Sequence, residues 1–129
     1  MFLAFENMKI QLDKCHRIII PPEIRGNFSD SYAYFGISPD GAYLEVMPAT
    51  YVRVMAKEYE RLHGKHRMGN KSVRLVYRKF FSAIYDRKVA KNYRIVIPLQ
   101  VRKQFGITDQ KELEARVVEE RLIIDRAAQ

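Results

Sequence analysis

The sequence lacks the features that secreted and membrane-spanning proteins usually carry. It contains one cysteine, Cys15, so no disulfide can form within the chain, which fits a reducing cytosol. No run of about 18 apolar residues is present, so we expect no transmembrane helix. The N-terminus does not show the basic-then-apolar pattern of a signal peptide. Together these absences favour a cytoplasmic protein that has no membrane partner.

The sequence also lacks the residue patterns of common catalytic and metal sites. No glycine-rich phosphate loop, paired-carboxylate pattern or Ser–His–Asp set is recognisable. His63 and His66 have the spacing of metal ligands on a helix, but Gly64 interrupts that helix and no acidic cluster lies nearby. We interpret Cys15 as a substituted turn residue in preference to a redox sensor. We therefore expect no enzymatic activity, no cofactor and no metal site.

Acidic residues are scarce in the middle of the chain. Residues 53–103 hold 15 of the 23 lysines and arginines but only three of the 15 acidic residues, and the net charge is +8. Such a concentrated basic segment is typical of proteins that bind an anionic polymer. One alternative is that these cations are simply solvated on helix surfaces. Another is an anionic membrane as the partner, but no stretch combines an apolar face with aromatic anchors suited to lipid. We predict nucleic acid as the partner.

One stretch occurs twice in the chain, 77 residues apart. Residues 12–25 and 89–102 share the frame Lys-x-x-Arg-Ile-x-Ile-Pro-x-x-x-Arg. Two copies at so long a spacing indicate a duplicated half-domain rather than a solenoid. A length of 129 residues suits one compact domain, or two intertwined halves of one.

Each copy has the pattern of a polar turn, a short strand and a helical turn. The β-branched runs Ile18–Ile20 and Ile95–Ile97 predict buried strands. These strands end at Pro21 and Pro98, because proline has no N–H group for a β-ladder. The arginine of each preceding turn has two possible roles. It pairs with a carboxylate at the rim of a barrel, or it belongs to a basic rim to which both copies contribute. Cations on both turns favour the second interpretation.

Further strands and two long helices are predicted around these copies. Alternation and β-branched content predict strands at residues 10–12, 32–37, 42–47, 113–118 and 122–124, with hairpin turns at 38–41 and 119–120. Residues 26–31 are predicted to be a loop, and residues 98–105 a helical turn capped by Gly106. Helical spacing of apolar residues predicts one helix from Pro48 to Gly64 and another from Asn70 to Ile84.

The second predicted helix carries an aromatic stripe at Tyr77, Phe80 and Phe81. We interpret this stripe as core or subunit interface rather than as a platform for stacking bases. The apolar helix faces exceed what two small half-barrels need to cover, so we predict a closed homo-oligomer.

These motifs resemble the MraZ family, bacterial proteins built from two swapped-hairpin AbrB-type repeats. Asp13 and Arg17 match the family's Asp-x-x-x-Arg signature, and Ile-Ile-Ile-Pro and Arg25 follow it as in the family. Residues 40–48 resemble the family's hairpin end, and residues 77–84 resemble its aromatic helix. The resemblance covers nearly the whole chain.

The chain departs from the family pattern at the two turns. The family usually has glycine before the signature arginine, where this chain has His16 and Tyr93. The aspartate of the second signature is replaced by Ala90.

The resemblance implies a mainly β, α+β fold. Repeats at residues 1–48 and 85–129 would form one pseudo-symmetric barrel, with two helices between them in residues 49–84. It also implies a cytoplasmic, nucleoid-associated transcriptional regulator that forms ring-shaped homo-oligomers. Such proteins bind short direct repeats of double-stranded DNA in the promoter of the division and cell-wall gene cluster. Two other classes stay open: an AbrB-type antitoxin that binds operator DNA and a toxin, and an RNA-binding basic barrel.

The predicted DNA-binding residues lie in the two copies of the repeated stretch. They are Lys14, Arg17, Arg25, Lys91, Arg94 and Arg102. Arg17 and Arg94 occupy the signature positions, and the shared frame supplies the others. We expect Asp13 to orient Arg17, because a carboxylate close to phosphate is repelled. Arg25 and Arg102 have an alternative role at the rim of the core, paired with acidic residues.

Overall fold

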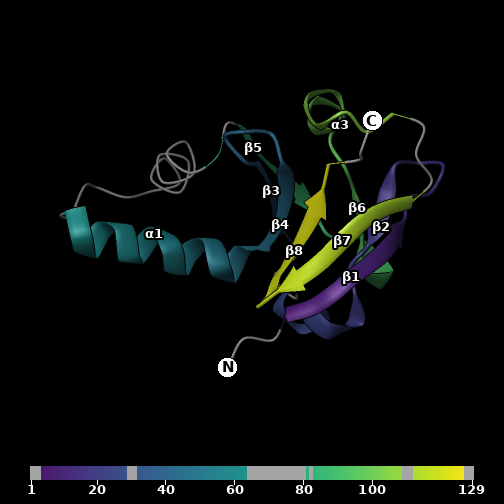
Figure 1. Ribbon diagram of the computed structural model, residues 1–129. Helices are drawn as coiled ribbons and strands as arrows, with labels where there is room; N and C mark the ends of the chain where they lie inside the picture. The colour runs from purple at the N-terminus through teal and green to yellow at the C-terminus, as the bar shows by residue number, and fades with distance from the viewer. Residues whose placement is uncertain (1–3, 29–31, 64–80, 82, 109–111, 127–129) are drawn as a thin grey trace.

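The computed structural model has a mixed α+β fold in which β-strands predominate (Figure 1), as predicted. It describes residues 4–28, 32–63, 81, 83–108 and 112–126. The strands are β1 (Ala4–Gln11), β2 (Arg17–Ile19), β3 (Tyr32–Ile37), β4 (Tyr43–Pro48), β5 (Ala83–Lys88), β6 (Arg94–Val96), β7 (Glu112–Val118) and β8 (Arg121–Asp125). The helices are α1 (Ala49–His63) and α3 (Leu99–Phe105), and two 3-10 segments are η1 (Pro22–Phe28) and η2 (Lys91–Tyr93).

Two antiparallel sheets make up the β-structure. Six strands form one sheet in the order β1-β7-β8-β4-β3-β5, while β2 and β6 form a separate two-stranded ribbon. The strands before and after α1 interleave, because β1 pairs with β7, β5 pairs with β3, and the central pair is β4–β8. The predicted closed barrel is not found in the described part of the chain, since β1 and β5 remain the edges of the larger sheet.

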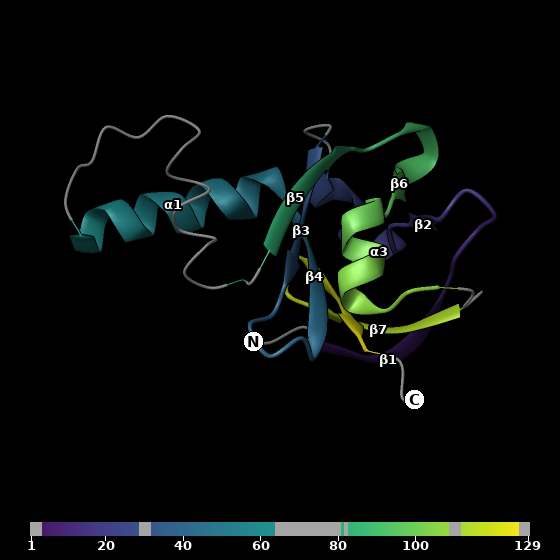
Figure 2. The ribbon, with the colours of Figure 1, turned by 90° about the horizontal axis from the view of Figure 1, so that it is seen from above.

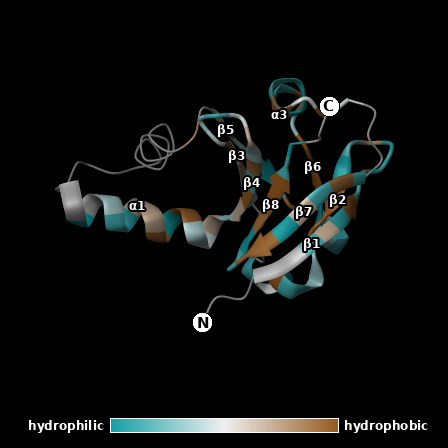
Figure 3. Ribbon diagram, in the orientation of Figure 1, coloured by the Kyte–Doolittle hydropathy of each residue, from teal (hydrophilic) through white to brown (hydrophobic). Residues whose placement is uncertain are grey.

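The main hydrophobic core includes residues from both the ribbon and the six-stranded sheet. Ile18 and Ile95 of the ribbon are fully buried in the same cluster as Leu44 and Val117 of the sheet. The strand β7 alternates between exposed and buried residues, whereas β8 is mainly buried. Figure 3, which colours the chain by hydropathy, shows hydrophilic and hydrophobic residues mixed along β7 and mostly hydrophobic ones along β8. The core therefore holds the ribbon at a fixed place beside the sheet.

A second cluster involves helix α1 and strand β4. Met47 of β4, Val52 of α1 and Phe81 form this cluster. The Phe81 ring lies so close to Gly36 that a Cβ atom there would come within 2.7 Å of it. Beyond this contact α1 points away from the strands (Figures 1 and 2). Within the described residues, no helix has the length and apolar character needed to cross a membrane.

Next to α1, a buried ion pair joins the two central strands. Arg121 of β8 donates to the carboxylate of Glu45 on β4, whose side chain is 5% exposed. The guanidinium also lies 4.9 Å from the centroid of the Tyr51 ring. Burial, the largest single influence, lowers the pKa of Arg121, but the charge and hydrogen bond of Glu45, together with Tyr51 and Glu119, outweigh it, so the pKa of Arg121 is raised.

Most predicted elements are confirmed, and three predictions are wrong. Residues 22–28 form η1 where a loop was predicted from residue 26, because Ile24 and Phe28 turn into the core. The second helix does not extend to Ile84, since β5 begins at Ala83 and pairs with β3; residues 64–80 lie outside the described part. The repeated strands are buried on one side only, as Ile19 is 43% exposed.

Candidate nucleic-acid interface

The two repeated stretches meet in the β2–β6 ribbon, and their pairing is symmetric. Ile18 lies opposite Ile95, and these residues occupy equivalent positions 77 apart. On either side Arg17 pairs with Val96, and Ile19 pairs with Arg94, so each pair exchanges into the other when the stretches are interchanged. The ribbon therefore has a local approximate two-fold axis at its central isoleucine pair.

The hydrogen bonds at the ends of the ribbon follow the same symmetry. The Ile20 N–H donates to the Tyr93 carbonyl at 2.9 Å, and the Ile97 N–H donates to the His16 carbonyl at 2.9 Å. Alternation along the ladder then puts the Arg17–Val96 and Ile19–Arg94 pairs at non-hydrogen-bonded positions, where facing side chains are closest.

One face of the ribbon is buried and the other carries both signature arginines. Ile18 and Ile95 point into the core with no exposed surface. Because side chains alternate along a strand, Arg17 and Arg94 lie on the opposite face with Ile19 and Val96. The arginines occupy one diagonal of this face and the aliphatic residues the other. We call these four residues the ribbon face.

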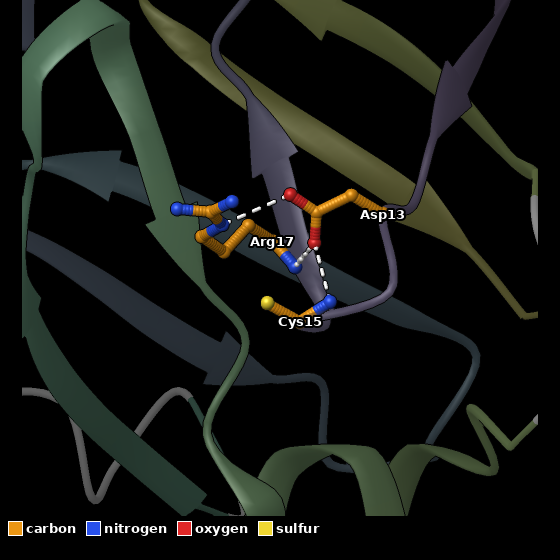
Figure 4. A network of polar contacts seen from close by, with 3 residues as sticks. All are labelled: Asp13, Cys15 and Arg17. Carbon is orange, nitrogen blue, oxygen red and sulfur yellow. Dashed lines mark hydrogen bonds and ion pairs between the residues drawn. The ribbon is translucent and has the colours of Figure 1, made fainter.

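The turn before β2 is organised by Asp13 (Figure 4). Its Oδ1 accepts the N–H groups of Cys15 and Arg17, both at 2.9 Å, and its Oδ2 accepts the Arg17 Nε–H at 2.9 Å. The Arg17 N–H, with the Arg17 guanidinium and the Cys15 N–H, holds the pKa of Asp13 below its ordinary value against the opposing effect of burial. Asp13 thus hydrogen-bonds both the backbone and the side chain of Arg17; that it orients Arg17 toward DNA stays a prediction.

The turn before β6 has a similar backbone but no carboxylate. The Ala90 N–H donates to the Arg94 carbonyl at 2.8 Å, as the Asp13 N–H does to Arg17 at 3.1 Å. Asn92 and Tyr93 both adopt a positive φ, 63° and 58°. Within the described residues no carboxylate forms an ion pair with Arg94, so no acidic side chain there competes with an outside anion for its guanidinium.

Both turns require the left-handed conformation immediately before the signature arginine. The φ angle is 60° at His16 and 58° at Tyr93. A side chain makes this conformation costly, and glycine adopts it freely. Glycine at either position would therefore relieve backbone strain.

The remaining predicted residues divide into exposed lysines and half-buried arginines. Lys14 and Lys91 are exposed in the two turns, at opposite ends of the antiparallel ribbon. Arg25 donates its Nε–H to the Ile20 carbonyl at 2.8 Å, and Arg102 donates to the Ile97 carbonyl at 3.1 Å. These last two arginines thus hold the ends of β2 and β6 to the segments that follow.

Arg25 also supports the second turn from the first repeated stretch. Its guanidinium carbon lies 5.5 Å from the centroid of the Tyr93 ring, a cation–π contact. Its bond goes to a backbone carbonyl, not to the acidic partner that was the alternative prediction. Because Nε is occupied, contact with DNA would have to use the terminal guanidinium nitrogens of Arg25 and Arg102.

Sequence reasoning missed the aliphatic half of the ribbon face. Ile19 and Val96 are 43% and 40% exposed, although the isoleucine-rich runs predicted buried strands. The shortness of both strands and the arginine two positions before each of these residues were the available signals. Among the described residues, no group of three His, Cys, Asp or Glu side chains is arranged to hold a metal ion.

Comparison with models of known protein families gave no match, and a search of curated proteins also gave none.

Proposed function

We propose that the protein is a sequence-specific DNA-binding regulator of transcription, similar in organisation to MraZ proteins. The observation that carries this proposal is the ribbon face, on which Arg17 and Arg94 lie with a lysine turn at each end. The major groove of B-DNA admits a two-stranded β-ribbon. Arginines on the outward face of such a ribbon can bind guanine edges, and lysines at its ends can bind phosphates.

The proposal includes two AbrB-type repeats related by an approximate two-fold axis. It is supported by the exchange symmetry of the ribbon and by matching registers in the large sheet. There Leu44 pairs with Ile124, Val46 pairs with Leu122, and Glu45 faces Ile123 between them. With Leu44 and Val46 equivalent to Leu122 and Ile124 at a spacing of 78, this pairing is also symmetric.

We further propose that the chain acts as a homo-oligomer, in a ring or another closed form. Several ribbon faces in one assembly would bind successive direct repeats, and linking them raises overall affinity without new contacts. The expected targets are promoter repeats of the division and cell-wall gene cluster, in the cytoplasm at the nucleoid. Light scattering at micromolar concentration tests the assembly, and a stable monomer would refute it.

The test of the function is selection of bound duplexes from a random DNA pool, followed by measurement of their affinity. We expect a defined sequence motif and a dissociation constant at least 100-fold lower than for unrelated DNA. RNA duplexes of the same sequence should bind much more weakly, because the major groove of A-form RNA is too narrow and deep for side chains to read. Equal affinity for every DNA and RNA duplex would refute the proposal and favour an RNA-binding or non-specific role.

A further inference from the structure

Two exposed aliphatic side chains lie between the arginines of the ribbon face. Ile19 and Val96 are 43% and 40% exposed, and they occupy equivalent positions in the two repeated stretches. A single exposed aliphatic residue is common and needs no explanation. Here two are exposed at symmetric places on a face that also carries two arginines, which suggests a shared ligand with both anionic and apolar features.

The DNA major groove offers this combination at thymine-containing sites. Guanine presents two acceptors, O6 and N7, to a bidentate arginine, whereas thymine presents the C5-methyl group, which apolar side chains contact. Resting on the proposed function, we infer that Ile19 and Val96 read thymine methyl groups, while Arg17 and Arg94 read guanines. Ile19 and Val96 would thus be specificity-determining residues.

The spacing of the four side chains suits neighbouring base pairs. Facing residues at a non-hydrogen-bonded position have Cα atoms about 4.5 Å apart, and diagonal residues are about 7–8 Å apart. Successive bases on one strand are separated by about 3.4 Å along the helix axis. Arg17 and Val96 therefore reach adjacent or nearly adjacent base pairs, and so do Ile19 and Arg94.

The symmetry of the ribbon determines the order of the bases. A two-fold axis in the protein is matched by an inverted arrangement in the DNA. The axis passes between Ile18 and Ile95, so one chain should read a guanine and a nearby thymine twice, in inverted order. If successive subunits bind direct repeats, each repeat unit should itself contain this short inverted motif.

Substitution of thymine by deoxyuridine tests the inference, because it removes the methyl group and leaves base pairing intact. A duplex selected from the random pool is used, and each thymine is replaced in turn. We expect two positions, symmetric about the centre of the motif, at which binding weakens about fourfold, the equivalent of one buried methyl group. Ile19→Ala should remove the deoxyuridine effect at one position and Val96→Ala at the other.

Val54→Ala in α1 is the matched control, since Val54 is 65% exposed and lies outside the ribbon; it should keep both effects. If Ile19→Ala does not fold, Val96→Ala tests the inference by itself at its own position. A selected motif without thymine or without inverted order would overturn the inference and leave the proposed function standing. So would full tolerance of deoxyuridine. Failure to bind any duplex would instead overturn the proposed function.

Discussion

Ile18 and Ile95 lie directly opposite each other in the β2–β6 ribbon, and both are fully buried. The pair connects the two repeated stretches to the core on one side and supports the arginines on the other. Loss of packing here should affect both stretches equally, because each isoleucine occupies the position of the other under the approximate two-fold axis.

We therefore expect Ile18→Val and Ile95→Val to lower the free energy of unfolding by similar amounts, about 1 kcal/mol each. Urea denaturation measures both values. Ile19→Val on the exposed face is the matched control and should change stability by less than about 0.5 kcal/mol. A cost confined to only one of the two buried isoleucines would contradict the equivalence of the stretches.

The three hydrogen bonds to the Asp13 carboxylate predict a pH dependence. The pKa of Asp13 is lowered in the folded protein, so its contribution to stability is present above the unfolded-state pKa of about 3.9 and is lost as the pH falls through the folded-state value. Melting temperatures of the parent and Asp13→Asn should differ at pH 7, begin to converge as the pH falls below about 4, and meet only below the lowered folded-state pKa. A difference that does not change with pH would show that the charge of Asp13 is not involved.

His16 and Tyr93 both have a positive φ angle, yet substitution by glycine should have opposite effects on protein stability at the two positions. Glycine relieves about 1–2 kcal/mol of strain but adds about 0.5–1 kcal/mol of unfolded-state entropy, so His16→Gly should stabilise by about 0.5 kcal/mol. Tyr93→Gly should destabilise, because it also removes the ring that Arg25 contacts. Thermal denaturation distinguishes these outcomes, and stabilisation by both glycines would mean that the ring contact contributes little.

The Glu45–Arg121 pair should be sensitive to the loss of one partner. Arg121→Ala leaves a buried carboxylate without its counter-charge, so we expect a loss of about 3 kcal/mol in unfolding free energy. Replacing both residues with methionine should cost less, since no buried charge remains. Arg116→Ala is the matched control: its pair with Asp125, at 3.5 Å, is exposed and should contribute at most about 1 kcal/mol. Equal losses from Arg121→Ala and Arg116→Ala would contradict this account.

The elements that the sequence predicted well are those set by local chemistry. Gly106 ends α3 with a φ of 82° and donates its N–H to the Arg102 carbonyl. Gly41 has a φ of 73° in the predicted hairpin turn. Both conformations need a residue that tolerates a positive φ. Glycine is such a residue, and its positions are visible in a single sequence.

The elements that it predicted poorly depend on distant partners. Residues 83–88 contain Asp86, Arg87 and Lys88 in succession, and so lack the alternation of a strand. They become β5 because β3 offers a free edge for pairing. Phe81 and Ile84 fit helical spacing, but their packing beside Met47 and Val52 is set by the tertiary fold.

The candidate site was predicted in part for the same reason. Asp13 and Arg17 belong to one turn, so their contact followed from local spacing. The exposure of Ile19 and Val96 depends on the pairing of β2 with β6, which are 77 residues apart, and composition alone favoured burial.

The central claim is that the ribbon face and its turns bind DNA, and one comparison tests it most directly. The affinity of the double variant Arg17→Ala/Arg94→Ala is compared with that of Lys9→Ala/Arg116→Ala, which removes the same charge from exposed positions on β1 and β7. Arg116 alternates with the core residues Ala115 and Val117, and so lies on the outer face of the sheet, away from the ribbon.

The measurement is fluorescence anisotropy with a selected duplex across a salt series, after circular dichroism confirms that each variant is folded. We expect each lost guanine contact to cost about 1–3 kcal/mol of binding free energy and to relax specificity, with the control close to the parent. Arg17→Ala alone should cost more than Arg94→Ala, because it also removes the partner of Asp13. Parent-like affinity and salt dependence in the ribbon variant would contradict the claim and move the DNA-binding surface elsewhere on the protein.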